Sequence, residues 1–350
     1  MKPSAIISAI CILAVLNAAC VECRTSGMFH WYKLFVFGDS FADTGNLPNG
    51  NLSEASRTWY QPYGSSDSFH YGRPTGRFSN GFIESDFIGK FLGRFEAPPT
   101  YAKRPKNYVE PAGMNFAVGG AGVFPVPRKA PTLGEQVGYF KKLIKDNVLH
   151  SYDLTDSVAL VAISGNDYAR VADMNSTTDV IDFVGNVTAE IAKQVRVLQK
   201  LKVTNILVNT LHPLGCTPWL SRAQNYTACD ARGNMGAGVH NGNLKQLLLG
   251  GKANKNVMLV DLNGAFTNFV DPDTSLTEQF EHKLEPCCES SDPKGYCGQV
   301  DEDGNDMYSV CDDPSSYFYW DDVHPTEAGW KAVMDQLEGQ IKDFLDISHN

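Results

Sequence analysis

Short runs of apolar residues recur along this 350-residue chain. Each run is continuous rather than alternating and is rich in Val, Ile, Leu or Phe, the pattern of a strand buried on both faces. The strands predicted in this way cover 34–37, 158–163, 205–209 and 257–260, with a further short one near Gly113.

Longer segments with apolar residues at helical spacing lie between these runs. They predict helices over 82–93, 133–144 and 180–201, a weaker one over 236–249, and a last one carrying the apolar stripe of 330–345. Pro325 or Thr326 opens the last helix, by the first-turn and capping preferences of those residues. Strands alternating with helices indicate an α/β fold with a mostly parallel sheet covered on both faces. No linker separates two cores, so we expect one domain over 24–350.

Two segments resemble ligand loops, but their spacing fails. The glycines of 115–122 lack the GxGxxG spacing of a dinucleotide site, because Pro125 stands where the third glycine belongs. The acidic run 301–306 has its glycine at the fourth position instead of the sixth, which favours a solvated loop over a calcium site. We therefore expect no metal and no cofactor.

The first residues indicate the compartment. Lys2 precedes an apolar run over 5–16 that is too short to span a bilayer, and small residues follow at Ala18 and Ala19. This pattern predicts a secretory signal peptide over about 1–23, with an N-terminal core helix as the alternative. We expect a secreted, extracellular protein (apoplast or cell wall) without a transmembrane anchor.

Glycosylation sequons agree with that compartment, and the net charge bears on the choice of partner. The acceptor asparagines are Asn51, Asn175, Asn186 and Asn225. The formal net charge is −10 and no block of Lys and Arg stands out, which excludes a nucleic-acid partner on electrostatic grounds.

Cysteine spacing predicts disulfides. Six of the nine cysteines follow the signal region, an even number suited to three bridges in an oxidising compartment. Cys216 and Cys229 form the favoured local pair. Adjacent Cys287 and Cys288 can hardly bond each other, so they pair with Cys297 and Cys311 in one of two ways. We expect these bridges to order a polar loop over 286–314.

The candidate chemistry begins at Ser40, which directly follows the first predicted strand. Open α/β sheets place ligand-handling residues at the carboxyl ends of their strands. Asp321 stands three residues before His324, so its carboxylate can fix the imidazole while the other ring nitrogen takes a proton from a serine. The alternatives are a turn serine at Ser40 and a helix-capping role for the Asp–His pair.

An oxyanion formed by such a serine needs hydrogen-bond donors. The Ser40 N–H, a glycine N–H from 119–120 and the Asn166 side-chain amide can supply them. Asn166 follows the second strand as Ser40 follows the first, so both side chains reach the same edge of the sheet; the alternative for Asn166 is a plain turn.

The motifs GDSF (38–41), NFAVGGAG (115–122), SGND (164–167) and DDVHP (321–325), in this order, resemble those of the plant GDSL esterase/lipase family, a branch of the SGNH hydrolases. The resemblance implies a three-layer α/β/α flavodoxin-like fold. It also implies Ser40 as nucleophile, His324 as base oriented by Asp321, and oxyanion donors at Ser40, Gly120 and Asn166. Phe41 departs from the leucine of the family motif.

These expectations lead to three functional hypotheses. The first is a secreted serine esterase or lipase acting on small-molecule or lipid esters, which we expect to be a monomer. The second is a transacylase that passes the acyl group to a sugar, a cutin monomer or a hydroxylated carotenoid. The third is a non-catalytic lipid- or glycan-binding protein. Loops over 47–75, 98–112 and 264–285 are expected to shape the pocket.

Overall fold

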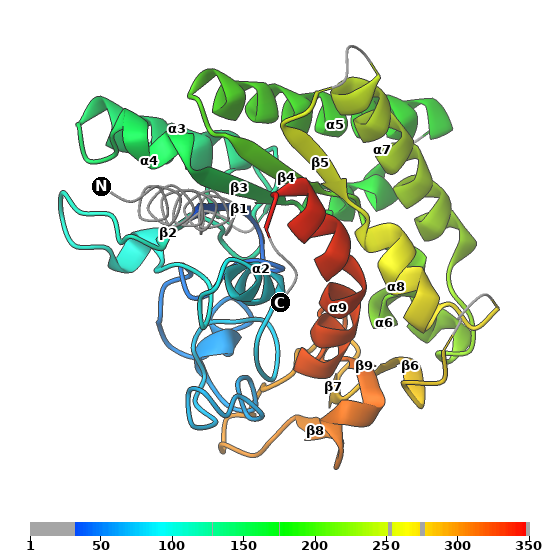
Figure 1. Cartoon of the computed structure of the whole chain (residues 1–350). Helices are drawn as coiled ribbons and strands as arrows, with labels where there is room; N and C mark the ends of the chain where they lie inside the picture. The colour runs from blue at the N-terminus through cyan, green and yellow to red at the C-terminus, as the bar shows by residue number, and fades with distance from the viewer. Residues whose placement is uncertain (1–31, 128, 175, 251–253, 274–276, 348–350) are drawn as a thin grey trace, which may run out of the picture.

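A five-stranded parallel sheet forms the centre of the molecule, with strand order β2-β1-β3-β4-β5 (Figure 1). The computed structural model describes residues 32–127, 129–174, 176–250, 254–273 and 277–347. The strands are β1 (Lys33–Gly38), β2 (Gly113–Asn115), β3 (Ser157–Ala162), β4 (Asn205–Asn209) and β5 (Val257–Val260). This order is the flavodoxin-like one, in which the chain reverses its direction of winding between β1 and β3.

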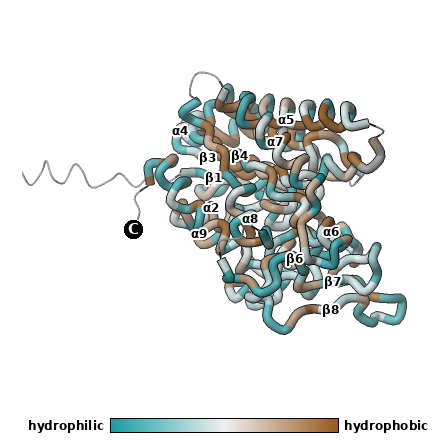
Figure 2. The backbone as a smooth tube through the Cα atoms, turned by 90° about the vertical axis from the view of Figure 1, so that its right-hand side faces the viewer, coloured by the Kyte–Doolittle hydropathy of each residue, from teal (hydrophilic) through white to brown (hydrophobic). Residues whose placement is uncertain are grey.

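Helices cover both faces of the sheet, which confirms the predicted three-layer α/β/α architecture. The α-helices of the described residues are α2 (Glu84–Phe91), α3 (Leu133–Lys145), α4 (Ser151–Thr155), α5 (Thr177–Lys200), α6 (Pro218–Ser221), α7 (Ala231–Leu249), α8 (Leu262–Val270) and α9 (Glu327–Phe344). Leu34 and Val36 of β1 pack with α2, α8 and α9, whereas Phe35 and Phe37 pack with α3, α5 and α7. The middle residues of β1, β3 and β4 are apolar on both faces, and brown segments lie near the labels β3 and β4 in Figure 2.

Helix boundaries follow their capping residues. Thr326 is the N-cap of α9, since its hydroxyl accepts the Gly329 N–H, which decides between the two predicted starts. The weak helix predicted from 236 begins at Ala231, where the Asp230 side chain accepts the Gly233 N–H. Glycines occupy several positions in its first turns, so the apolar periodicity used to predict helices does not extend back to Ala231.

Two predicted loops were partly wrong. The segment 264–285 is not loop throughout, because α8 runs to Val270 and packs Phe266 and Phe269 into the core. The cysteine-rich segment 286–314 holds β7 (Cys288–Ser290) and β8 (Tyr308–Val310), paired antiparallel, while β6 (His282–Pro286) pairs with β9 (Tyr317–Tyr319). These short strands lie at the end of the molecule away from α5 (Figures 1 and 2).

Disulfides fasten this outer part of the fold. The predicted Cys216–Cys229 bridge is present, and the two open pairings resolve as Cys287–Cys311 and Cys288–Cys297. The predicted signal peptide and Asn175 lie outside the described residues; Asn51, Asn186 and Asn225 are exposed. No helix among the described ranges is long and apolar enough to cross a membrane.

Candidate active site

Ser40 lies in the tight turn after β1, next to the point where β1 and β3 diverge. Gly38 makes this turn possible: its φ is +148°, and a Cβ there would lie 2.0 Å from the Ala162 carbonyl oxygen of β3. The Gln136 side chain fixes the strand end, accepting the Gly38 N–H at 2.8 Å and donating to the Gly38 carbonyl at 2.9 Å. A turn, not a helix, follows Ser40.

Ser40, His324 and Asp321 form one hydrogen-bonded chain. The Ser40 Oγ lies 2.8 Å from His324 Nε2, and His324 Nδ1 lies 2.7 Å from Asp321 Oδ1. Asp321 Oδ1 also accepts the backbone N–H groups of Val323 and His324, so the turn before α9 holds carboxylate and ring together. All three side chains are buried.

The charge state of Asp321 suits this arrangement. Burial works against its ionised form, but the charge and hydrogen bond of His324 and the charge of Arg57 outweigh burial and hold the pKa of Asp321 well below its usual range. An anionic carboxylate therefore faces the imidazole N–H, fixing the tautomer in which Nε2 is free to accept the Ser40 proton.

The glycine loop lies beside the serine. Val118 donates its N–H to the Gly38 carbonyl at 3.0 Å, and the Gly119 N–H is taken by the Asp43 carboxylate at 2.8 Å. Gly120 has a left-handed φ of +79°. Among the hydrogen bonds of the described residues, none is donated by the N–H of Ser40 or of Gly120. Both N–H groups are thus available to an oxyanion.

Asn166 follows β3 at the same edge, but its amide is engaged. The Nδ2 group donates to Asp39 Oδ2 at 3.1 Å and to the Ala121 carbonyl at 3.0 Å, so one of these bonds has to be exchanged before it donates to an oxyanion. Asp39 also accepts the N–H and hydroxyl of Ser164. Burial raises the pKa of Asp39 to about 7, against these hydrogen bonds.

Several groups around the site were not identified from the sequence. The ring of Phe41 contacts Trp330 and His212. Burial lowers the pKa of His212 to about 3, and the charge of His324 adds to the effect. The buried His212 ring is therefore neutral at physiological pH. Asp39 stands in the GDSF motif beside the serine and Asp43 lies three residues after it, so both had a local signal; Gln136 had none.

The chain offers little to a metal. Within the described ranges, no group of three or more His, Cys, Asp or Glu side chains is arranged to hold a metal ion. In the acidic loop, the Asp301 carboxylate accepts N–H groups of Asp303 and Asn305 from its own turn.

A hydrogen-bonded Ser–His–Asp chain at the carboxyl edge of a flavodoxin-like sheet is an arrangement found in serine hydrolases. The model of the GDSL-like lipase/acylhydrolase family matches residues 34–337. The chain therefore belongs to this family, and its enzymatic class is that of the carboxylic ester hydrolases.

Relatives with similar sequences agree. The GDSL esterase/lipase At5g03610 of Arabidopsis thaliana is 36% identical, over 89% of this chain and 88% of its own. The GDSL esterase/lipase At3g09930 of the same plant is 34% identical over the same shares. Among solved structures, a catalytic mutant of an acetylxylan esterase from Geobacillus stearothermophilus aligns with 91% of this chain and 95% of its own, at 14% identity and a TM-score of 0.40.

Proposed function

We propose that this protein hydrolyses carboxylic esters through an acyl-enzyme on Ser40, with His324 as general base. The observation that carries the proposal is the 2.8 Å contact between Ser40 Oγ and His324 Nε2, continued at 2.7 Å to Asp321. A serine hydroxyl is a weak nucleophile unless a base is within hydrogen-bond reach. The burial of all three groups keeps water from competing for these bonds.

In the acylation step, His324 takes the Ser40 proton as Oγ attacks the ester carbonyl. The tetrahedral oxyanion accepts N–H groups of Ser40 and Gly120, and the Asn166 amide joins them by giving up one of its present bonds. Asp321 stabilises the transient imidazolium, which then protonates the departing alcohol.

In the second step, a water or an alcohol releases the acyl group. His324 deprotonates the acceptor, which attacks the Ser40 ester and yields a free acid or a new ester. Hydrolysis is the primary proposal because family membership supports it. Transacylation to an alcohol uses the same residues and differs only in how well the acceptor excludes water.

We further propose that the protein is secreted and glycosylated. Disulfides persist in oxidising compartments, and the three bridges therefore support export. The exposure of Asn51, Asn186 and Asn225 leaves these acceptors accessible to glycosylation.

The test is a Ser40→Ala variant assayed on p-nitrophenyl esters of increasing acyl length, with and without added alcohols. Loss of the nucleophile is expected to lower kcat by about 10⁴- to 10⁶-fold. Ser65→Ala, at an exposed serine, is the matched control. Free acid and new ester are measured separately, which distinguishes hydrolysis from transacylation.

A serine-directed phosphonate provides the second readout. It is expected to label wild type and Ser65→Ala but not Ser40→Ala. An active Ser40→Ala enzyme, or wild type that is neither labelled nor active, would refute the acyl-enzyme on Ser40.

A further inference from the structure

The second oxygen of Asp321 is also held by side chains. Asp321 Oδ2 accepts the Tyr63 hydroxyl at 2.8 Å, and Arg57 Nη2 lies 3.5 Å from the same oxygen. Arg57 Nε in turn donates to the Tyr63 hydroxyl oxygen at 2.8 Å. Since a guanidinium can only donate, the phenol must accept from Arg57 and donate to Asp321. The direction of both hydrogen bonds, from Arg57 to Tyr63 and from Tyr63 to Asp321, is thereby fixed.

Packing locks both residues in place. Tyr63 is fully buried in a cluster with Trp320 and the cysteines of the two outer disulfides. Burial, partly offset by Arg57, raises the pKa of Tyr63 well above its usual value, so the phenol keeps its proton. The Arg57 guanidinium lies 5.0 Å from the centre of the Phe78 ring, whose own centre is 4.8 Å from that of His324.

We propose that Tyr63 and Arg57 are positioning residues for the hydrolytic reaction, a proposal that rests on the catalytic roles proposed above. Tyr63 holds the Asp321 carboxylate in the plane that aims Oδ1 at the His324 ring. Arg57 orients Tyr63 and offsets part of the negative charge that faces the imidazole. Together they fix the position of the Asp321 carboxylate and the net charge that faces the His324 ring.

The sign of the electrostatic effect follows from Coulomb's law. An Asp321 carboxylate without its cation stabilises the imidazolium more strongly, so removal of Arg57 is expected to move the acid limb of the kcat/KM profile to higher pH. Removal of the Tyr63 hydroxyl concentrates charge on the carboxylate and acts in the same direction. Other titratable groups lie near Arg57, Asp321 and His324. His212 stays neutral through burial, and Asp322 is paired with Arg222 at 2.5 Å. Glu54 and Tyr296 interact electrostatically with Arg57 and are unchanged in every variant.

The experiment compares Tyr63→Phe, Arg57→Met and Arg57→Lys with wild type, using kcat, KM and the pH profile of kcat/KM. Tyr60→Phe is the matched control, because the Tyr60 hydroxyl also donates one hydrogen bond from this loop, to the Gly50 carbonyl. Thermal unfolding of each variant verifies that it is folded.

Tyr63→Phe is expected to lower kcat about tenfold, the effect of one lost hydrogen bond to a charged group, with KM unchanged. Arg57→Met is expected to move the acid limb of the profile upward by about half a pH unit or more. Arg57→Lys keeps the charge, so its limb stays at the wild-type pH while kcat still falls.

Two results would overturn the proposal. One is wild-type kcat and an unshifted limb in both Tyr63→Phe and Arg57→Met. The other is a limb that stays in place in Arg57→Met although kcat falls, which means that Arg57 only packs. Ser40→Ala, assayed in parallel, separates the two proposals: its inactivity beside such results rejects the positioning roles alone, whereas its activity rejects the catalytic serine.

Discussion

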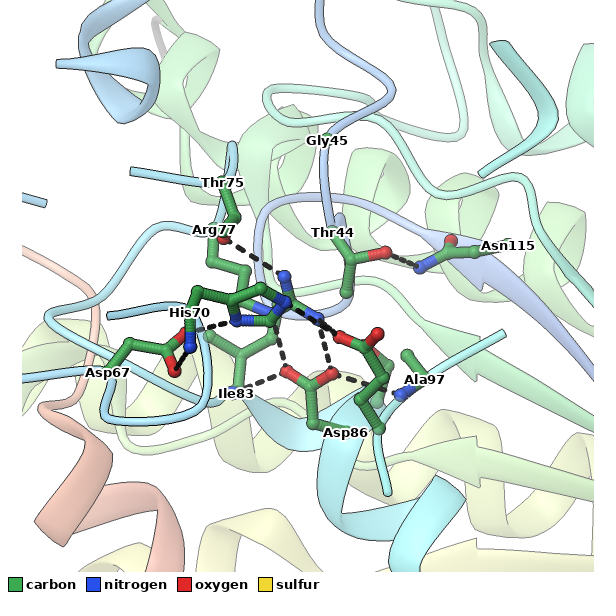
Figure 3. A network of polar contacts seen from close by, with 12 residues as sticks. Thr44, Gly45, Asp67, His70, Thr75, Arg77, Ile83, Asp86, Ala97 and Asn115 are labelled. Carbon is green, nitrogen blue, oxygen red and sulfur yellow. Dashed lines mark hydrogen bonds and ion pairs between the residues drawn. The ribbon is translucent and has the colours of Figure 1, made fainter. Parts of the chain in front are cut away.

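Two arginine–aspartate pairs lie below the surface of this protein, and they use their carboxylates differently. In the first, Asp86 accepts two parallel bonds from Arg77, Nε to Oδ2 at 2.8 Å and Nη2 to Oδ1 at 2.7 Å. The backbone N–H groups of Ile83 and Ala97 fill the remaining acceptor positions, as Figure 3 shows. Both carboxylate oxygens of Asp86 thus accept only from Arg77 and from backbone N–H groups, none of which takes up or releases a proton at physiological pH. We therefore interpret this pair as structural.

The second pair is open on one side. Arg57 is 3.5 Å from Asp321 and reaches it mainly through Tyr63, so no two-bond fork forms. The other carboxylate oxygen accepts from His324, whose charge changes in the mechanism proposed above. In the first pair both oxygens of Asp86 bind Arg77 and the backbone. In the second pair one oxygen of Asp321 also binds the His324 ring. The difference lies in geometry, because burial is similar in both pairs.

The largest expected effect distinguishes the two aspartates by activity. Asp321→Asn removes the anion that orients His324 and is expected to lower kcat about 10⁴-fold, as in serine hydrolases with this triad. Its unfolding free energy should fall by only about 1 to 2 kcal/mol, since most hydrogen bonds can re-form. Steady-state assays and urea unfolding measure both quantities.

Asp322→Asn is the matched control for this variant, because the neighbouring carboxylate binds Arg222 and not the histidine. The control should keep near-wild-type kcat. If both variants lost activity equally, the open carboxylate of Asp321 would have no special role.

The second prediction reverses the pattern. Asp86→Asn leaves the buried Arg77 with Glu96, whose side chain is 35% exposed, as its ion-pair partner, and with the charge of Asp67 farther away. We expect the unfolding free energy to fall by about 3 to 5 kcal/mol, the usual cost of breaking a buried pair. The kcat per folded molecule should stay unchanged below the melting transition. A large drop in kcat with little loss of stability would show that the Arg77–Asp86 pair supports activity, and the two pairs would then not differ in role.

Much of the fold could be predicted from the sequence because its signals are local. The strands of the central sheet are apolar on both faces and stand out as continuous runs, and Thr326 begins α9 as a capping residue should. The helix α8 was missed because its apolar positions follow β5 almost directly. The strands β6 to β9 are each too short to show periodicity and depend on the disulfides and on Trp320 for their place.

The site divides in the same way. Ser40, Asp321 and His324 carry motif signals, and the structure brings their side chains together. Tyr63 and Arg57 lie in a segment that reads as an irregular loop, and Tyr63 meets Asp321 across 258 positions of the chain. Nothing local marks such a contact. The engagement of the Asn166 amide by Asp39 could not be predicted either, since it depends on how two separate loops meet.

The smallest expected effect is one that both pairs share. Burial alone would raise the pKa of Asp86, but the charge and hydrogen bonds of Arg77 outweigh it and lower the pKa below the ordinary value of 3.8; the pKa of Asp321 is lowered as well. A lowered folded-state pKa gives stability that is complete above the unfolded value and disappears as the pH falls through the folded one.

The difference in unfolding free energy between wild type and Asp86→Asn should therefore be constant from neutral pH to about pH 5. Below pH 3.8 it should narrow by about 1.4 kcal/mol per pH unit until the folded pKa is reached. Asp39 and Glu84, whose pKa values burial raises to about 7 and about 8, titrate in both proteins and cancel in the difference. Urea unfolding at several pH values measures it, and Asp321→Asn should give a dependence in the same direction, since the pKa of Asp321 is lowered as well. A difference that already closes between pH 7 and 5 would mean that Arg77 does not hold Asp86 ionised. The two pairs would then differ in charge state as well as in geometry.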